Sequence, residues 1–225
     1  MTCTEHVFMF LSMKSALAKS LLNSPFITTG RELEARQSQS RGSFDLAAVK
    51  GKLVEVRSVG SPAGLSTALS LLKEAQTAYE PIAWIMTNDS LFYPPDMAEQ
   101  GIDLGALVIV RVHGAKLGAR AAEHVLRSGA FGLIILDLGE DLNVPEPMQN
   151  RLMQGAHKHQ SAVVCLTRSE ESEEHRSLGS MVALSVEVTK ESRGRELVCS
   201  VHAQRNKGGG NWRVERRCYG PVGMR

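Results

Sequence analysis

The residues with the clearest chemical pattern lie in the stretch VRSVGSPAGLSTALSLL, at positions 56–72, between an apolar run and a helix-like segment. A phosphate-binding loop of the form GxxxxGK[ST] needs backbone N–H groups that converge on phosphate, a lysine that reaches the terminal phosphates and a hydroxyl for magnesium. Glycines and hydroxyls occur here at nearly that spacing, as Gly60, Gly64, Ser66 and Thr67. The lysine position, however, holds Leu65, and an apolar side chain cannot offset the charge of a triphosphate. The stretch therefore has the outline of a nucleotide site without its main cation.

A carboxylate that could have served the same site ends the apolar run GLIILD, as Asp137. In a working nucleotide site an aspartate at the end of such a strand holds magnesium. A carboxylate in this position also commonly caps the turn or helix that follows a buried strand. Because Leu65 removes the cation, we interpret Asp137 as a structural residue and the whole set as a degenerate nucleotide site. We expect no cofactor, no metal ion and no catalytic residue.

The elements that must position these residues alternate along the chain. Apolar runs predict strands at 52–56, 82–86, 106–112, 131–138 and 162–167. Helical periodicity predicts helices at 65–79, 118–129 and 148–160, and places Leu65, Ala68, Leu69, Leu72, Ala75 and Tyr79 on one face of the first. Strands that alternate with single helices are typical of a doubly wound, mainly parallel sheet flanked by helices. The fold class is therefore α/β.

The C-terminal part of the core has a different pattern. The runs VALSVEV, LVCSVHA and NWRVERR predict antiparallel strands, and the glycines of QRNKGGG suit a hairpin turn between the last two. From Lys190 to Arg225 there are nine Lys or Arg against three Glu, so this tail carries a charge of about +6, nine minus three. We expect the sheet to end in an antiparallel hairpin with a basic surface.

The first 43 residues are expected to lie outside this core. Residues 14–23 place Ala16, Leu17, Leu21 and Leu22 at helical spacing, up to Pro25. We predict an N-terminal helical segment over residues 1–27, a flexible polar linker over 28–43 and the core over 44–225. Translation could begin at Met13 instead of Met1, because MKSALAKSLL is itself an amphipathic opening.

Composition limits the function classes. The 225 residues can bury one sizeable core, and a net charge of +2 does not by itself imply a polyanion partner. The 4 cysteines are scattered without CxxC spacing, so we expect neither a disulfide framework nor a zinc site, and a reducing cytoplasm as the compartment. The apolar run VFMFLSM near the start is too short to span a membrane.

The order of these pieces resembles the core of the RecA-type recombinases: LVEV and the degenerate loop, then IAWIMTNDSLFYPPDMAEQGIDLGALVIVR, then AAEHVLRSGAFGLIILDL. The last two segments are more specifically similar to the RecA-related ImuA family of mutagenesis accessory proteins, and the SulA family of cell-division inhibitors is similar over the same stretch. The resemblance covers about residues 42–220. It implies a RecA-like fold and a part in damage-induced (SOS) translesion DNA synthesis. The partners it implies are an ImuB-like inactive homologue of Y-family polymerases, RecA and an error-prone polymerase.

The sequence departs from the RecA pattern at the catalytic positions. Asn88 or Asp89, with Asn88 favoured, lies where RecA proteins carry the glutamate that activates water, and Arg168 lies where they carry a glutamine that senses the γ-phosphate. The two DNA-binding loops of the family correspond to GEDLNVPEP and SEESEEHRSLG, whose carboxylates would repel a phosphate backbone. The resemblance with these losses predicts a non-catalytic protein whose contact with DNA is weak or indirect.

Such a protein needs surfaces that bind partners. The candidates are the N-terminal helix and the basic tail, through Leu17, Leu21, Leu22, Trp212, Arg213, Arg216, Arg217 and Tyr219. Self-association through the N-terminal segment is a further option, and Trp212 packed on the core is the alternative for the tail.

Three other functions stay open. The hairpin HAQRNKGGGNWRVERR could bind single-stranded DNA, since it combines cations with an aromatic ring. A SulA-like inhibitor of cell division is a second alternative. An ATPase that takes its lysine from elsewhere, as Lys73 or Lys116, is the third.

Overall fold

The computed structural model describes residues 43–218, apart from residues 61, 88–89, 91, 170–176 and 195. These residues belong to one compact unit. The predicted helical segment, nearly all of the predicted linker and the end of the tail lie outside the described residues. The boundaries at 27 and 43 therefore stay predictions.

The described residues form one sheet of eight strands in the order β3-β2-β4-β5-β1-β6-β7-β8. The strands are β1 (Leu53–Val59), β2 (Ile82–Met86), β3 (Leu107–Arg111), β4 (Leu133–Gly139), β5 (Ala162–Ser169), β6 (Leu184–Arg193), β7 (Glu196–Asn206) and β8 (Arg213–Cys218). Neighbours from β3 to β6 pair in parallel, whereas β7 is antiparallel to both β6 and β8. The predicted α/β class, with a mainly parallel sheet and an antiparallel edge, is confirmed.

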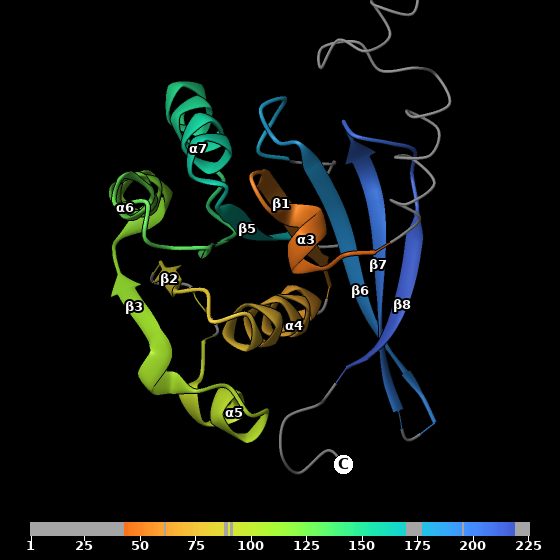
Figure 1. The fold of residues 1–225 in the computed structure, drawn as a ribbon. Coiled ribbons are helices and arrows are strands. Elements are labelled where there is room, and N and C mark those ends of the chain that lie inside the picture. Colours follow the sequence, from red (N-terminus) through yellow and green to blue (C-terminus); the bar gives the residue numbers. More distant parts are fainter. Residues whose placement is uncertain are drawn as a thin grey trace, which may run out of the picture. The chain divides into compact units, whose positions relative to one another are not determined.

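Helices cover both faces of the sheet (Figure 1). They are α3 (Leu46–Val49), α4 (Ala63–Thr77), α5 (Pro94–Glu99), the 3-10 turn η1 (Leu104–Ala106), α6 (Gly114–Arg127) and α7 (Glu146–His159). On β4, Ile135 belongs to the core under α4, whereas Ile134 and Leu136 belong to the core under α6 and α7. Continuous apolar strands are expected when both faces are buried. Each fully buried apolar side chain of these strands stabilises the fold by about 1.5–3 kcal/mol of transfer free energy. The sheet is therefore a stable frame that positions the loops at its ends.

The first predicted helix differs from the structure at both ends. It begins at Ala63, ahead of the predicted start at Leu65, and it ends at Thr77. Tyr79, predicted to lie on its buried face, is 95% exposed and has a positive φ of 55°. The N–H groups of Tyr79 and Glu80 donate to the carbonyls of Gln76 and Ala75 in a Schellman-type ending. The prediction for Tyr79 was wrong because this motif turns the chain away from the helix.

The antiparallel edge contains a disulfide between Cys199 on β7 and Cys218 on β8, with a Cα–Cα distance of 5.8 Å. The expectation of no disulfide was therefore wrong. The two cysteines are 19 residues apart in sequence, but the hairpin places them at diagonal positions of neighbouring strands, since Cys199 lies opposite Arg216. Cys165, on the central strand β5, is a buried free thiol. No helix among the described residues is long and apolar enough to cross a membrane.

Candidate functional site

The degenerate nucleotide site lies where β1 leads into α4, at the carboxyl ends of the parallel strands. Open α/β sheets bind ligands at this edge. Gly60 follows β1 with a positive φ of 68°, and its N–H donates to the Ser169 carbonyl at the end of β5. Gly60 is thus needed by the turn itself, because L side chains rarely adopt that conformation.

The backbone amide that would face a phosphate is hydrogen-bonded to a side chain of the protein itself. The Gly64 N–H donates to Ser58 Oγ over 2.8 Å, and both groups are buried. A Cβ added to Gly64 would lie 2.6 Å from Ser58 Oγ. Gly64 is therefore required for the close approach of Ser58. Ser58 was not among the predicted site residues. The sequence feature that could have identified it is a hydroxyl at the end of an apolar strand, six residues before the glycine.

The other motif residues serve the helix. Thr67 Oγ1 donates to the Ala63 carbonyl over 3.1 Å, within the first turn of α4. Leu65 is half-buried and packs against the core under α4. Ser66 is half-buried and does not line the cavity described next. The Thr67 hydroxyl is thus satisfied within α4, and Leu65 contributes to the packing of the helix on the sheet.

The space left beside the turn is a cavity of about 10 Å³, close to the minimum for one water molecule. It brings together several residues predicted from the sequence with neighbours from β1 and β5: Ser58, Pro62, Gly64, Leu65, Asp137, Leu166, Thr167 and Arg168. Gly60 and Thr67 are not among its lining residues, and neither are Lys73 and Lys116. The described residues beside the turn thus leave little internal space.

Asp137 is 4% exposed at this cavity and accepts a hydrogen bond from Ser90 Oγ. Burial raises the pKa of the Asp137 carboxyl, while the Ser90 hydroxyl and the charge of Arg168 act in the opposite direction. The described residues contain no group of three or more His, Cys, Asp or Glu that could hold a metal ion.

The two acidic loops have structural contacts where the structure describes them. Asp141, in the first loop, accepts hydrogen bonds from the N–H groups of Ala115 and Asn143, at 2.9 and 3.0 Å. It thus caps the first turn of α6, where a carboxylate is favourable. Residues 170–176 of the second loop lie outside the described residues, as do Asn88 and Asp89.

The end of the second loop is held by Glu55, a fully buried carboxylate on β1. Glu55 accepts hydrogen bonds from Ser177 Oγ at 2.7 Å, from the Leu178 N–H at 3.0 Å and from Ser185 Oγ at 2.9 Å. A buried charge with three donors is a well-satisfied group. Glu55 therefore anchors the chain between β5 and β6 to the sheet.

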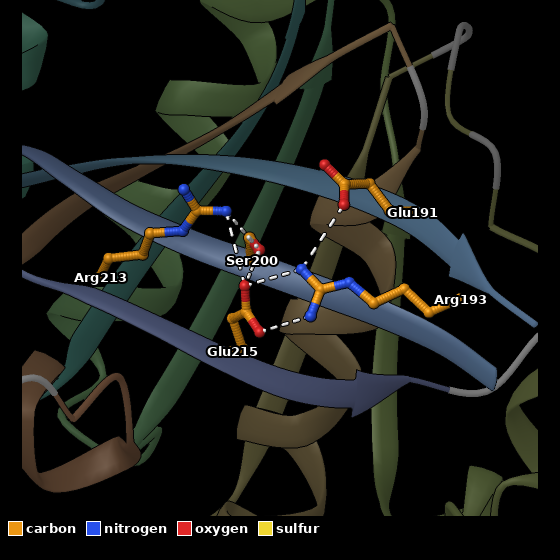
Figure 2. A network of polar contacts seen from close by, with 5 residues as sticks. All are labelled: Glu191, Arg193, Ser200, Arg213 and Glu215. Atoms are coloured by element: carbon orange, nitrogen blue, oxygen red, sulfur yellow. Dashed lines mark hydrogen bonds and ion pairs between the residues drawn. The ribbon is translucent and has the colours of Figure 1, made fainter.

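Three of the predicted partner-binding residues of the tail, Arg213, Arg216 and Arg217, lie on β8. Figure 2 shows Glu191, Arg193, Ser200, Arg213 and Glu215 together on one face of the antiparallel edge. Arg193 binds Glu215 through two hydrogen bonds of 2.8 and 2.9 Å, and Arg213 donates to Ser200 Oγ. The hydrogen bond from Arg193 holds the pKa of the Glu215 carboxyl below its usual range. This face therefore presents paired charges of both signs.

The remaining predicted residues of the tail are also partnered. Arg216 lies 3.9 Å from Glu74 of α4, and Arg217 lies 3.3 Å from Glu196. Trp212 is half-buried against the core under α4, with its ring centroid 6.4 Å from that of Phe44. Leu17, Leu21, Leu22 and Tyr219 lie outside the described residues.

Comparison of the sequence with protein-family models and with curated proteins found no match.

Proposed function

We propose that this protein is a non-catalytic, RecA-like accessory protein of damage-induced mutagenic translesion DNA synthesis. It acts by binding an ImuB-like polymerase homologue, and RecA as a further partner, in the cytoplasm. The proposal combines the resemblance of the segments around GIDLGALVIVR and AAEHVLRSGAFGLIILDL with the geometry of the β1–α4 turn. Its partners come from the resemblance alone.

The observation that carries the non-catalytic part is the hydrogen bond from the Gly64 N–H to Ser58 Oγ. Phosphate loops use such amides to bind phosphate. Here the amide has an internal acceptor, Leu65 fills the lysine position with an apolar group, and the adjoining cavity is about 10 Å³. These features support a scaffold that works through its surfaces and not through a nucleotide.

The cytoplasm is proposed from the scattered cysteines, which lack CxxC spacing, and the disulfide between Cys199 and Cys218 makes this placement testable. Disulfides are rare in a reducing compartment. Trapping thiols with a maleimide at the moment of cell lysis would report both cysteines as free in a cytoplasmic protein. Full protection from the reagent would contradict the cytoplasmic placement.

The function is tested by pull-down of the ImuB-like protein and RecA from the same cells with the intact chain. We expect the ImuB-like protein to be retained. Removal of residues 1–30 tests the N-terminal segment, which lies in a separate unit from the core. The tail is better tested with Arg217→Glu than by truncation, because β8 pairs with β7 and Trp212 packs on the core.

The matched control for Arg217→Glu is Lys158→Glu, since it reverses the charge of a different exposed cation, which lies on α7. Failure of the intact protein to retain either partner would exclude the accessory function. If, in addition to that failure, expression of the protein elongated cells by blocking division, the SulA-like alternative would replace the accessory function.

A further inference from the structure

An open hollow of about 620 Å³ lies between α6 and α7. The side chains from α6 that line it include Lys116, Arg120, Glu123, His124 and Arg127. The opposite side, at the start of α7, is provided by Pro145, Pro147, Met148 and Arg151. This hollow is separate from the cavity beside the β1–α4 turn, with which it shares no lining residue.

The lining of this groove is basic. Among the described residues that line it, Lys116, Arg120, Arg127 and Arg151 face one carboxylate, Glu123, which leaves a net charge of four minus one, or +3, with histidine counted as neutral. Glu123 pairs with Arg151 at 3.7 Å. Within the described part of the chain, Lys116, Arg120 and Arg127 make no ion pair. They differ in this from Arg213, Arg216 and Arg217 of β8.

The unpaired cations lie along one side of α6. Lys116, Arg120 and Arg127 are separated by four and seven residues, which places them on the same helical face. Like charges four residues apart destabilise a helix by about 0.2–0.5 kcal/mol. Lys116 and Arg120 are the cations of the groove with this spacing, whereas Glu123 lies three residues after Arg120 and four before Arg127. The uncompensated charge is therefore concentrated at Lys116 and Arg120, and two adjacent cations without an ion pair among the described residues point to an anionic ligand.

The scaffold holds this row in a fixed geometry. Gly118 faces the sheet so closely that a Cβ there would lie 3.0 Å from Leu136 of β4. Leu126 of α6 packs on Gly155 of α7, where a Cβ would lie 3.2 Å from Leu126 Cδ1. Both helices are thus locked against the sheet and against each other, which preorganises the cations.

We propose that the α6–α7 groove binds the phosphate backbone of DNA, without reading its base sequence. Phosphate contacts need only cations and other donors, and they supply most of the affinity of non-specific binding. An interface for an acidic protein would be expected to carry aromatic anchors, but the described residues that line the groove include no aromatic ring apart from the imidazole of His124. Bases stack on aromatic side chains, and because the described lining has none apart from His124, we do not propose base stacking in the groove. The inference does not depend on the proposed role in translesion synthesis.

The test is fluorescence anisotropy of a labelled thymine oligonucleotide and of a duplex of equal length, titrated with the full chain over a range of salt concentrations. With about −0.7 per neutralised phosphate on a single strand, the three cations without an ion pair give a slope of log K against log salt of about −2.1. We expect Lys116→Gln together with Arg120→Gln to reduce the slope to about −0.7. Lys158→Gln, an exposed cation on α7 outside the groove, is expected to leave it unchanged.

A second measurement needs no variant. Acetylation of the wild-type protein by a lysine reagent, followed by mass spectrometry, should show Lys116 protected by the oligonucleotide and Lys158 not protected. Absence of DNA binding at low salt would overturn the proposal. So would DNA binding whose salt slope is unchanged in the double variant and that leaves Lys116 unprotected from acetylation. So would binding of polyglutamate in the groove without binding of either DNA, which would assign it to an acidic protein partner.

Discussion

Ser58 Oγ accepts a hydrogen bond of 2.8 Å from the backbone N–H of Gly64, in the turn where a nucleotide-binding protein would present that amide to a phosphate. The same pair explains why position 64 is glycine, because a Cβ there would lie 2.6 Å from Ser58 Oγ. The hydrogen bond of the turn thus depends on two residues, and Leu65, at the position where a phosphate-binding loop carries lysine, adds an apolar side chain beside it.

The first prediction concerns this pair. Ser58→Ala leaves the buried Gly64 N–H without an acceptor, so we expect a loss of about 1–3 kcal/mol in the free energy of unfolding, measured by urea titration. Gly64→Ala is expected to destabilise the protein through its clash with Ser58 Oγ. In the Ser58→Ala background the clash is removed, because the next atoms lie 3.6 and 3.9 Å away. A double-mutant cycle should therefore show that Gly64→Ala costs less in that background.

Ser70→Ala is the control for this cycle. Its hydroxyl contacts only the Ser66 carbonyl within α4, and surface substitutions of this kind usually change stability by less than about 0.5 kcal/mol. Additive effects of the Ser58 and Gly64 substitutions would show that the two residues are not coupled as described.

The second prediction is a pH dependence at Asp137. Burial raises the pKa of this carboxyl, so its contribution to stability is full below its unfolded pKa of about 3.9 and is lost as pH rises through the higher folded pKa. Asp137→Asn removes this loss and can keep the hydrogen bond from Ser90. Unfolding titrations between about pH 4 and 7 should show the variant gaining stability relative to the wild type as pH rises. A relative loss with rising pH would mean that the fold favours the charged carboxylate, as a cation site would.

The third prediction concerns Glu55. Glu55→Ala leaves the Ser177 and Ser185 hydroxyls and the Leu178 N–H without their acceptor, so we expect a loss of at least about 3 kcal/mol in unfolding free energy. Faster amide exchange of Leu178 would accompany it. Glu191→Ala, which removes an exposed carboxylate 3.6 Å from Arg193, should change stability by less than about 1 kcal/mol. Equal effects of the two substitutions would refute the anchoring role of Glu55.

A fourth prediction follows from the disulfide. Because Cys199 and Cys218 enclose a loop of 19 residues, the bond is expected to stabilise the oxidised protein by about 3 kcal/mol. Addition of dithiothreitol should lower the melting temperature of the wild type and leave that of the Cys199→Ser, Cys218→Ser double variant unchanged. A melting temperature insensitive to reductant in both proteins would show that the bond does not stabilise the edge.

Much of this fold could be predicted from the sequence because its strands are long apolar runs and its main helices have clear periodicity. The strands around Trp84 and Ile135, and the stop of α6 at Gly129, are of this kind. The short helix α5 and the turn η1 were not predicted, since six and three residues carry too little periodicity.

The candidate site was predictable only in part. Leu65 and Asp137 could be placed together because the carboxyl ends of parallel strands lie at one edge of a sheet, although β5 separates β1 from β4. Ser58 and Ser90 could not be assigned, since a single hydroxyl in sequence does not reveal which amide or carboxylate it will meet. The pairing of Cys199 with Cys218 likewise depends on the register of β7 and β8, which a count of cysteines does not contain.

The central claim is that the β1–α4 turn is closed to nucleotides, and calorimetric titration of the intact protein with ATP and magnesium tests it most directly. We expect no saturable heat from the wild type. We expect none from Leu65→Lys either, because the restored cation leaves the Gly64 amide bound to Ser58 and the cavity at about 10 Å³. A one-to-one isotherm with either protein would contradict the claim.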